Sequence, residues 1–306
     1  MPSGRRRYTT NNIIWTIPLS LLLLFALTTG INGKDVTTIA PPAVIGYSNS
    51  PSWWPWIIAD SEKFLEKNRV NAELKWYDNY SDSVSDLNSG FIDGNSQVDE
   101  DTRASSPKAV KGKIGILLNA YSNGEDKLIV RDSIQTIEDL KGKTIIAESA
   151  TATNDLLSLV INSHESEIYV NDIEVINLET GSASAAFAAN EEIDGVISFA
   201  PYSIVALERK NSHELLSSKD FPREIARMLV VTKDISDKRP KLAKQLTDVW
   251  FQSLDFIQKH PQKANQIITQ RIGIEADWVS IFQEQIQLVR REEATASKVL
   301  AYLRAK

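Results

Sequence analysis

From residue 40 onward, short apolar runs typical of strands alternate with segments that have the periodicity of helices. The clearest strand is VNAELKWYD at residues 70–78, where apolar and polar side chains alternate strictly, a pattern that predicts one buried face. Gly and Pro stand at the segment boundaries, as expected for turns and helix ends. This alternation predicts an α/β fold with mainly parallel sheets and ligands near the carboxyl ends of strands. From Pro240 to Lys306 we predict helices.

The composition argues against several kinds of site. With 306 residues, of which 42% are hydrophobic, the chain is long enough for one large domain or two ordinary ones. It has no cysteine, so disulfides and thiolate chemistry are excluded. Three histidines disfavour a His/Cys zinc site, and a net charge of -6 disfavours a nucleic-acid-binding face. We therefore expect no metal, no cofactor and no nucleic-acid partner.

Residues 1–30 have the pattern of an export signal. Three arginines at positions 5–7 precede an apolar core near Ile13–Leu27, and small residues follow it. The core contains Pro18 and has about 15 residues, which is short for a membrane span of roughly 20. We predict a cleaved signal peptide at residues 1–30 and a linker at 31–39. The alternative is an uncleaved anchor at residues 13–30; in either case the prediction is a periplasmic location.

Five stretches together carry a family resemblance. They begin with GYSNSPSWWPWIIAD (residues 46–60) and LKWYDNYSDSVSDLNSGFIDGNSQ (74–97). SNGEDKLIVRDSIQTIEDLKGKTIIAES (122–149), LETGSASAAFAANEEIDGVISFAPYS (178–203) and SSKDFPREIARMLVV (217–231) follow. In this order the chain resembles the nitrate/sulfonate/taurine-type substrate-binding proteins of ABC importers. Their superfamily includes the pyrimidine synthases of thiamine biosynthesis, and the resemblance covers roughly residues 40–290.

The resemblance implies a two-lobed periplasmic-binding-protein fold of type II. The chain would cross between lobes twice, near residues 127–131 and 227–233. Lobe one would comprise residues 40–127 and 230–306, and lobe two residues 128–229. A small solute would bind in the cleft at the hinge and be delivered by a monomer to the membrane permease of an ABC transporter, with hinge closure around the solute.

The Trp-rich stretch SPSWWPW at residues 50–56 supplies the first candidates for the ligand site. Trp53 and Trp54 follow a predicted strand, where a cleft would open, and an indole offers an apolar wall with one N–H donor. We expect at least one of them to contact ligand, together with Ser48. For Trp56, which begins a helix, core packing is an equally good interpretation.

Further candidates lie at loops that follow strands or precede helices. Asn95 and Gln97 offer amide groups, and the turn around Gly124 brings Ser122, Asn123 and Asp126 toward the hinge. Asp126 has two open roles, pairing with a ligand amine or bracing the hinge. Thr151, Ala152 and Thr153 precede a predicted helix, whose free backbone N–H groups favour an anionic oxygen. The last candidate is Pro201, at the start of another predicted helix.

A solute-binding protein is the function that these patterns favour, and we predict no enzymatic activity. Ser/His/Asp and P-loop motifs do not occur in the sequence. Two alternatives stay open: a membrane-tethered sensor or accessory domain, and a pyrimidine-synthase-like enzyme. Taurine or an alkanesulfonate is the solute that the resemblance suggests, with nitrate, an amide or an aminopyrimidine as other possibilities.

Overall fold

The computed structural model describes residues 40–105, 112–148, 156–159, 161 and 168–305. The predicted signal peptide and linker lie outside this part of the chain, as do Thr151, Ala152 and Thr153. Among the described residues, we find no helix with the length and apolar character that a membrane span requires.

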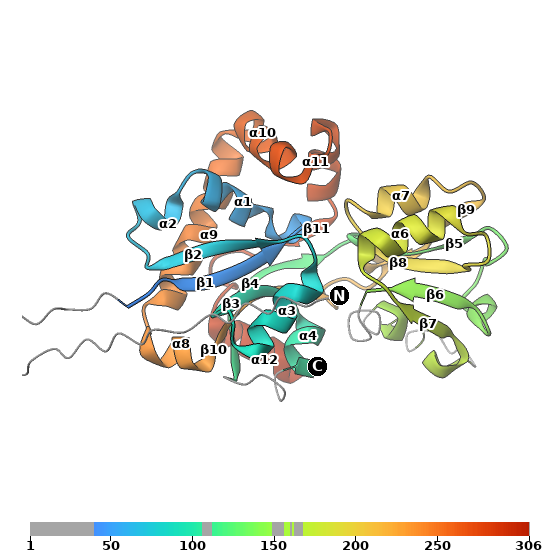
Figure 1. Cartoon of the computed structure of the whole chain (residues 1–306), viewed down its shortest axis with the longest axis horizontal. Helices are drawn as coiled ribbons and strands as arrows, with labels where there is room; N and C mark the ends of the chain where they lie inside the picture. Colours follow the sequence, from blue (N-terminus) through green and yellow to red (C-terminus); the bar gives the residue numbers. More distant parts are fainter. Residues whose placement is uncertain (1–39, 106–111, 149–155, 160, 162–167, 306) are drawn as a thin grey trace, which may run out of the picture. The chain divides into compact units, whose positions relative to one another are not determined.

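The described strands form two sheets, one of six strands and one of five (Figure 1). The six-stranded sheet has the order β11-β4-β10-β3-β1-β2. Its strands are β1 (Ala43–Ser48), β2 (Ala72–Tyr77), β3 (Gly94–Val98), β4 (Lys113–Ser122), β10 (Ala226–Thr232) and β11 (Ile286–Leu288). The five-stranded sheet has the order β7-β6-β8-β5-β9. Its strands are β5 (Asp126–Arg131), β6 (Thr144–Ala147), β7 (Glu174–Asn177), β8 (Gly195–Phe199) and β9 (Ser212–Ser217).

Both sheets are mixed, so the prediction of mainly parallel sheets was wrong. β1 pairs in parallel with β2 and β3, but β10 is antiparallel to both β3 and β4. Likewise β6 is parallel to β7 and β8, whereas β5 is antiparallel to β8 and β9. The reason is topological. β5 and β10 each enter a sheet directly from the other one, without a helical crossover, and therefore run against the strands beside them.

Helices connect most of the remaining strands. In the six-stranded part they are α1 (Trp54–Ser61), α2 (Phe64–Lys67), α3 (Tyr80–Ser89), α4 (Asp99–Ser105), α8 (Lys233–Lys238), α9 (Leu242–Lys259), α10 (Pro261–Ile272), α11 (Ala276–Gln283) and α12 (Ala296–Ala305). In the five-stranded part they are α6 (Thr180–Ala189) and α7 (Ser203–Leu207). Short 3-10 turns are η1 (Pro51–Trp53), η3 (Glu138–Leu140), η4 (Val170–Asp172) and η5 (Ser218–Asp220).

The C-terminal region is not entirely helical, contrary to the prediction. Between α11 and α12 the chain adds β11 to the edge of the six-stranded sheet, antiparallel to β4. Edge pairing satisfies the backbone groups of β4 that would otherwise face solvent, and a strand of three residues, Ile286–Leu288, is too short to show a strand pattern in the sequence.

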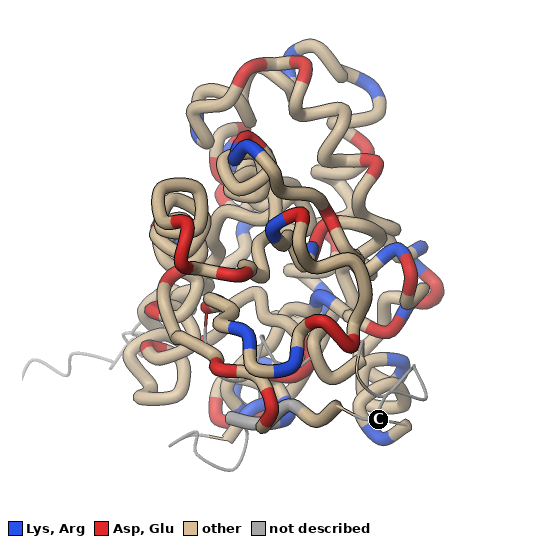
Figure 2. The backbone as a smooth tube through the Cα atoms, turned by 90° about the vertical axis from the view of Figure 1, so that its right-hand side faces the viewer, with Lys and Arg blue, Asp and Glu red and all other residues tan. Residues whose placement is uncertain are grey.

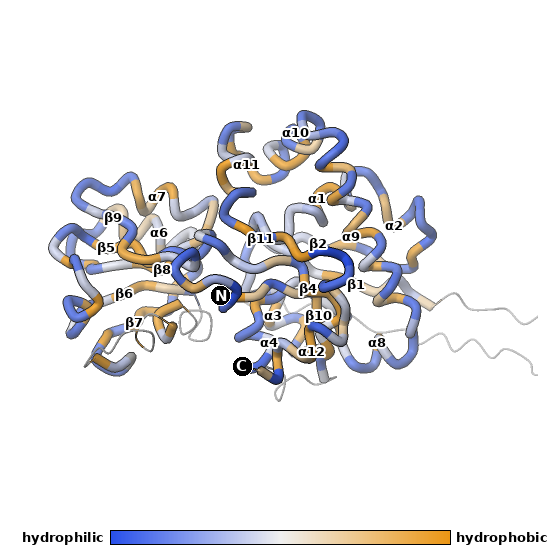
Figure 3. Tube along the Cα trace, turned by 180° about the vertical axis from the view of Figure 1, so that it is seen from behind, coloured by the Kyte–Doolittle hydropathy of each residue, from blue (hydrophilic) through white to orange (hydrophobic). Residues whose placement is uncertain are grey.

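Coloured by hydropathy, the Cα trace shows hydrophobic residues along several strands of both sheets (Figure 3). β2 is half-buried as predicted, because its side chains alternate between partly buried and exposed from Ala72 to Trp76. Trp56 is fully buried and packs against Trp250 with ring centroids 5.1 Å apart, and its Nε1 donates to Ser96 Oγ at 3.1 Å. Core packing is thus the role of Trp56. Basic and acidic residues are interspersed in the view of Figure 2.

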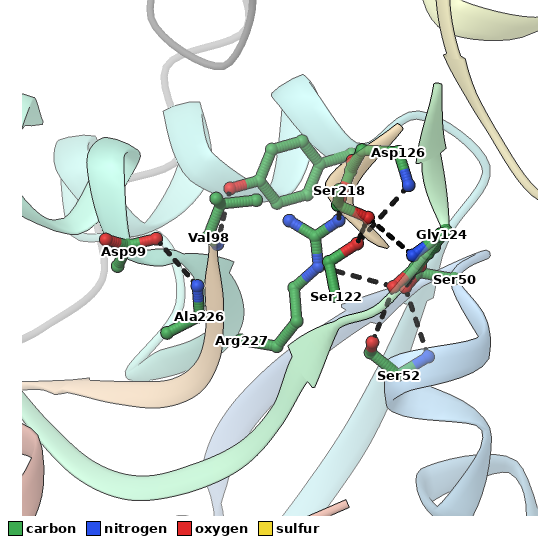
Figure 4. Close-up of polar contacts among 12 residues, drawn as sticks. Ser50, Ser52, Val98, Asp99, Ser122, Gly124, Asp126, Ser218, Ala226 and Arg227 are labelled. Carbon is green, nitrogen blue, oxygen red and sulfur yellow. Dashed lines mark hydrogen bonds and ion pairs between the residues drawn. The ribbon is translucent and has the colours of Figure 1, made fainter. Parts of the chain in front are cut away.

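The chain passes between the sheets at two places, which we call the hinge: residues 123–125 between β4 and β5, and residues 218–225 between β9 and β10. Gly124 has a φ of +101° there, a conformation that favours glycine, as its place in the turn suggested. Ser218 joins the two passages, because its Oγ lies 2.6 Å from Ser122 Oγ and accepts from Gly124 N at 2.7 Å (Figure 4). The domain boundaries given above stay a prediction.

Candidate functional site

A cavity lies beside the hinge, at the carboxyl ends of parallel strands from both sheets. It contains about 590 Å³ of empty space, including its opening to solvent. The six-stranded part contributes Ser50, Trp53, Tyr80, Val98, Ile225 and Arg227. The five-stranded part contributes Asp126, Glu148, Leu156, Thr180, Ile197 and Phe199. Ligand sites of open α/β sheets lie at this end of the strands, where loops and helix starts converge.

One wall of the cavity is aromatic. Trp53 stacks on Tyr80 with ring centroids 5.3 Å apart and an interplanar angle of 28°. Tyr80 is fixed in turn, because its hydroxyl donates to Asp101 Oδ2 at 2.5 Å and accepts from Val98 N at 3.1 Å. The wall is therefore rigid before any solute arrives, which lowers the entropic cost of binding a flat or apolar group.

A buried ion pair forms the polar end of the cavity (Figure 4). Arg227 extends from β10, and its Nη2 donates to both carboxylate oxygens of Asp126, the first residue of β5, at 2.8 and 2.6 Å. The Arg227 side chain is 4% exposed. Burial alone would lower the pKa of Arg227, but Asp126 and Glu125 outweigh it and hold that pKa above its ordinary value. The guanidinium is therefore a fixed positive charge that ties the two sheets together.

Glu125 is a second carboxylate beneath this pair. It is fully buried, its Oε2 lies 3.6 Å from Arg227 Nε, and it accepts hydrogen bonds from the hydroxyls of Ser50 and Ser52. Burial raises the pKa of Glu125 above its usual value, against the opposing effect of Arg227. The two serines belong to the loop that carries Trp53, so this carboxylate couples the Trp-rich loop to the hinge.

The cavity includes two of the predicted site residues, Trp53 and Asp126. Trp54 is 1% exposed and packs edge-on against Phe282, with centroids 6.2 Å apart. Asp126 pairs with Arg227, so the geometry shows its bracing contact. The other described candidates are outside the lining of this cavity: Ser48, Asn95, Gln97, Ser122, Asn123 and Pro201.

Those candidates make contacts inside the protein. Asn95 donates to Ser83 Oγ at 3.1 Å, and Gln97 Oε1 accepts from Thr102 Oγ1 at 3.1 Å. Both side chains are fully buried in β3. Asn123 N donates to the carbonyl of Gln285 at 2.8 Å, which connects the hinge to the C-terminal region.

The sequence-based reasoning missed Arg227 and Glu148. Arg227 lies inside a strand pattern, ARMLVVT, where a charge between apolar residues was a usable signal of a buried ion pair. Glu148 follows β6 directly, at the same end of the sheet as Thr180 after β7. The sequence signal for Glu148 was its position directly after a buried strand.

Comparison with known proteins identifies the family. Residues 51–264 match the family model described as NMT1/THI5 like, which is more than half of the chain. The chain belongs to the NMT1/THI5-like family. A protein of Brucella abortus (strain 2308) with the provisional name of binding protein is 23% identical over 242 residues, covering 76% of this chain and 72% of the relative.

Solved structures with the same fold include binding proteins and an enzyme. The alkanesulfonate-binding protein SsuA from Xanthomonas axonopodis pv. citri, bound to MOPS, has a TM-score of 0.72 at 18% identity, covering 87% of this chain and 91% of that one. The periplasmic nitrate-binding protein NrtA from Synechocystis PCC 6803 has 0.63 at 13%, covering 77% and 68%. The desulfurization enzyme DSZB has 0.57 at 15%, covering 86% and 90%. The predicted two-lobed periplasmic-binding-protein fold is thus confirmed.

Proposed function

We propose that this member of the NMT1/THI5-like family is an extracytoplasmic solute-binding protein that captures a small organic solute for the permease of an ABC transporter. The observation that carries the proposal is the cavity beside the hinge, to which both sheets contribute side chains. Such a site changes shape when the lobes move, so solute binding and closure are coupled. The permease partner, the monomeric state and the periplasmic location rest on the family resemblance and on the predicted export signal.

A sulfonate or taurine is the solute suggested by the resemblance and by the name of the Xanthomonas protein. The charged residues that line the described cavity favour a solute with a cationic group. Asp126 and Glu148 line it as anions, and the guanidinium of Arg227 is already paired with Asp126. A solute with an amine, such as taurine, suits this lining better than a simple sulfonate or nitrate.

An enzyme with this fold is the competing function, because the desulfurization enzyme shares it. Thiolate catalysis is excluded for this chain, since it has no cysteine. A tethered sensor or accessory domain is a further alternative, and the mass of the mature protein separates it from a protein with a cleaved signal.

The proposal is tested with residues 31–306 in a thermal-shift screen against alkanesulfonates, taurine, organic amines, nitrate and pyrimidines. A true solute at about 100 times its Kd stabilises the protein by about 2.7 kcal/mol, which raises Tm by about 5 °C at this size. Calorimetry then measures stoichiometry, and mass spectrometry follows the compound over hours. One-to-one binding of an unchanged compound supports the proposal, whereas chemical conversion of the bound compound contradicts it.

A further inference from the structure

The carboxylate of Glu148 is held between helices of the two lobes. Its Oε1 accepts from the backbone N and the Oγ of Ser81, in the first turn of α3, at 3.2 and 2.7 Å. Its Oε2 accepts from the backbone N and the Oγ1 of Thr180, the first residue of α6, at 3.3 and 2.5 Å. α3 belongs to the six-stranded part, and α6 and Glu148 to the five-stranded part (Figure 1).

These four donors are the kind that bind free anions. The first N–H groups of a helix have no partner within the helix, and the helix dipole adds partial positive charge there. At α3 the N-cap residue, Asn79, makes no side-chain cap. At α6 the N-cap residue, Glu179, accepts from Gly181 N and Ser182 N, and Glu148 accepts from the preceding N–H. Glu148 thus completes the caps of two helices that begin in different lobes.

We propose that Glu148 fills an anion-binding hole between the lobes with the protein's own carboxylate, and thereby selects a neutral or cationic solute over an anionic one. This inference rests on the proposed solute-binding function and names the class of solute for that site. Glu148 is 8% exposed and lines the cavity. A free sulfonate has the charge of Glu148 and needs the same donors, so it competes with a tethered carboxylate that has a far higher effective concentration.

The charges of the described lining point the same way. Arg227 contributes +1, and Asp126 and Glu148 contribute -2, so the described ionisable residues of the lining sum to -1. Arg227 and Asp126 compensate each other at 2.6 Å, so Glu148 supplies the remaining formal charge among the described ionisable residues of the lining. A second anion placed beside Glu148 is repelled by it, whereas an ammonium or amidinium group is attracted. The solute that fits presents such a group to Glu148 and an apolar face to Trp53.

Removal of the carboxylate should therefore create an anion site. The test compares the wild type with Glu148→Ala by titration calorimetry, with acetate and methanesulfonate as probes and chloride as the background salt. We expect at least a tenfold gain in affinity for one or both probes in Glu148→Ala. The matched control is Glu179→Ala, which removes a carboxylate from the start of the same α6 but vacates no hole between the lobes, and it should gain less than threefold.

A second pair of variants protects the test against loss of fold. Glu148→Gln removes the charge but keeps the shape of the side chain, so it should gain less anion affinity than Glu148→Ala, because its amide still occupies the hole. In Ser81→Ala/Glu148→Ala the gain should shrink, since one hydroxyl donor from the other lobe is missing. If either Glu148 variant gives no cooperative thermal transition, Glu148→Ser takes its place in the same comparison. Equal anion affinity in Glu148→Ala and Glu179→Ala overturns the proposal.

The solute screen on the wild type separates this inference from the proposed function. A wild type that binds an amine or neutral solute, and loses at least tenfold affinity for an amine in Glu148→Gln, supports both. A wild type that binds a simple sulfonate, with affinity that rises in Glu148→Gln, keeps the function and overturns the solute class. A wild type that binds no solute, beside a Glu148→Ala variant that binds acetate, refutes the function and keeps the anion hole.

Discussion

Replacing Arg227 by methionine tests whether the hinge depends on its buried ion pair. Methionine has a similar length and no charge, so the change removes the guanidinium while filling much of its volume. It leaves Asp126 and Glu125 as adjacent carboxylates without their cation. Glu125 is fully buried and the Asp126 side chain is 15% exposed, so water replaces the lost partner poorly.

The expected loss of unfolding free energy at pH 7 is about 3–5 kcal/mol, the range for breaking a buried pair by removing one partner. The double variant Asp126→Asn/Arg227→Met removes both charges of the Arg227–Asp126 ion pair. It should recover at least about 2 kcal/mol of that loss, because a neutral amide is far cheaper to bury than a carboxylate. Together with the single variant Asp126→Asn, the recovery gives the coupling energy between the two residues, which are in direct contact.

The pH dependence supplies an independent readout. Burial already raises the pKa of Glu125 above 4.5, and Arg227 opposes that rise. Without Arg227 the folded-state pKa rises further above the unfolded value. The contribution of protonated Glu125 to stability is then fully present below its unfolded-state pKa and is lost as pH rises through its folded-state pKa. The deficit of Arg227→Met relative to the wild type should therefore be smaller at pH 5 than at pH 7.

Urea denaturation at both pH values measures these quantities, with the midpoint and the slope m fitted separately. A shift of the midpoint at constant m reports stability alone. A loss below about 1 kcal/mol at pH 7, or a deficit that grows on acidification, would refute the reasoning that Arg227 stabilises the buried carboxylates.

Three further variants test the aromatic wall and a half-buried lysine. Trp53→Ala should weaken solute binding about tenfold or more, as measured by calorimetry. Trp54→Ala should instead lower the free energy of unfolding by about 3–5 kcal/mol in urea melts and change the affinity of the folded protein less than threefold. Similar affinity losses in both variants would contradict the assignment of Trp53 to the cavity. Burial lowers the pKa of Lys113 from 10.5 to about 8, so folding disfavours its charged form and stability rises as pH increases from 8 to 10.5. Lys113→Met should therefore stabilise the protein by about 1–2 kcal/mol at pH 7, after allowance for solvent screening, and by much less at pH 10; a gain that is independent of pH would assign the effect to packing alone.

The local patterns of the sequence predicted much of the fold. Strict alternation placed the half-buried strand at residues 70–78, where β2 runs from Ala72 to Tyr77. The turn around Gly124 was recognisable because a φ of +101° favours glycine. The direction of β5 and β10 was not predictable, because an apolar strand sequence does not reveal whether the neighbouring strands run parallel or antiparallel to it.

The candidate site was predictable only in part, because most of its contacts join residues that are far apart along the chain. Trp53 could be found because three indoles stand within four positions of one loop. Arg227 is 101 positions from Asp126, and Glu148 is 67 positions from Ser81 and 32 from Thr180. Local periodicity says nothing about such pairs, so the ion pair and the carboxylate between two helices were missed.

The sequence by itself determined the class of fold, the order of most strands and helices, the absence of thiol chemistry and the family. Each of these follows from neighbouring residues or from composition. The tertiary structure alone decided which charges meet and which indole faces the cavity. Those outcomes depend on how two sheets approach across the hinge, where the low dielectric makes each pairing of charges strong and each unpaired charge costly.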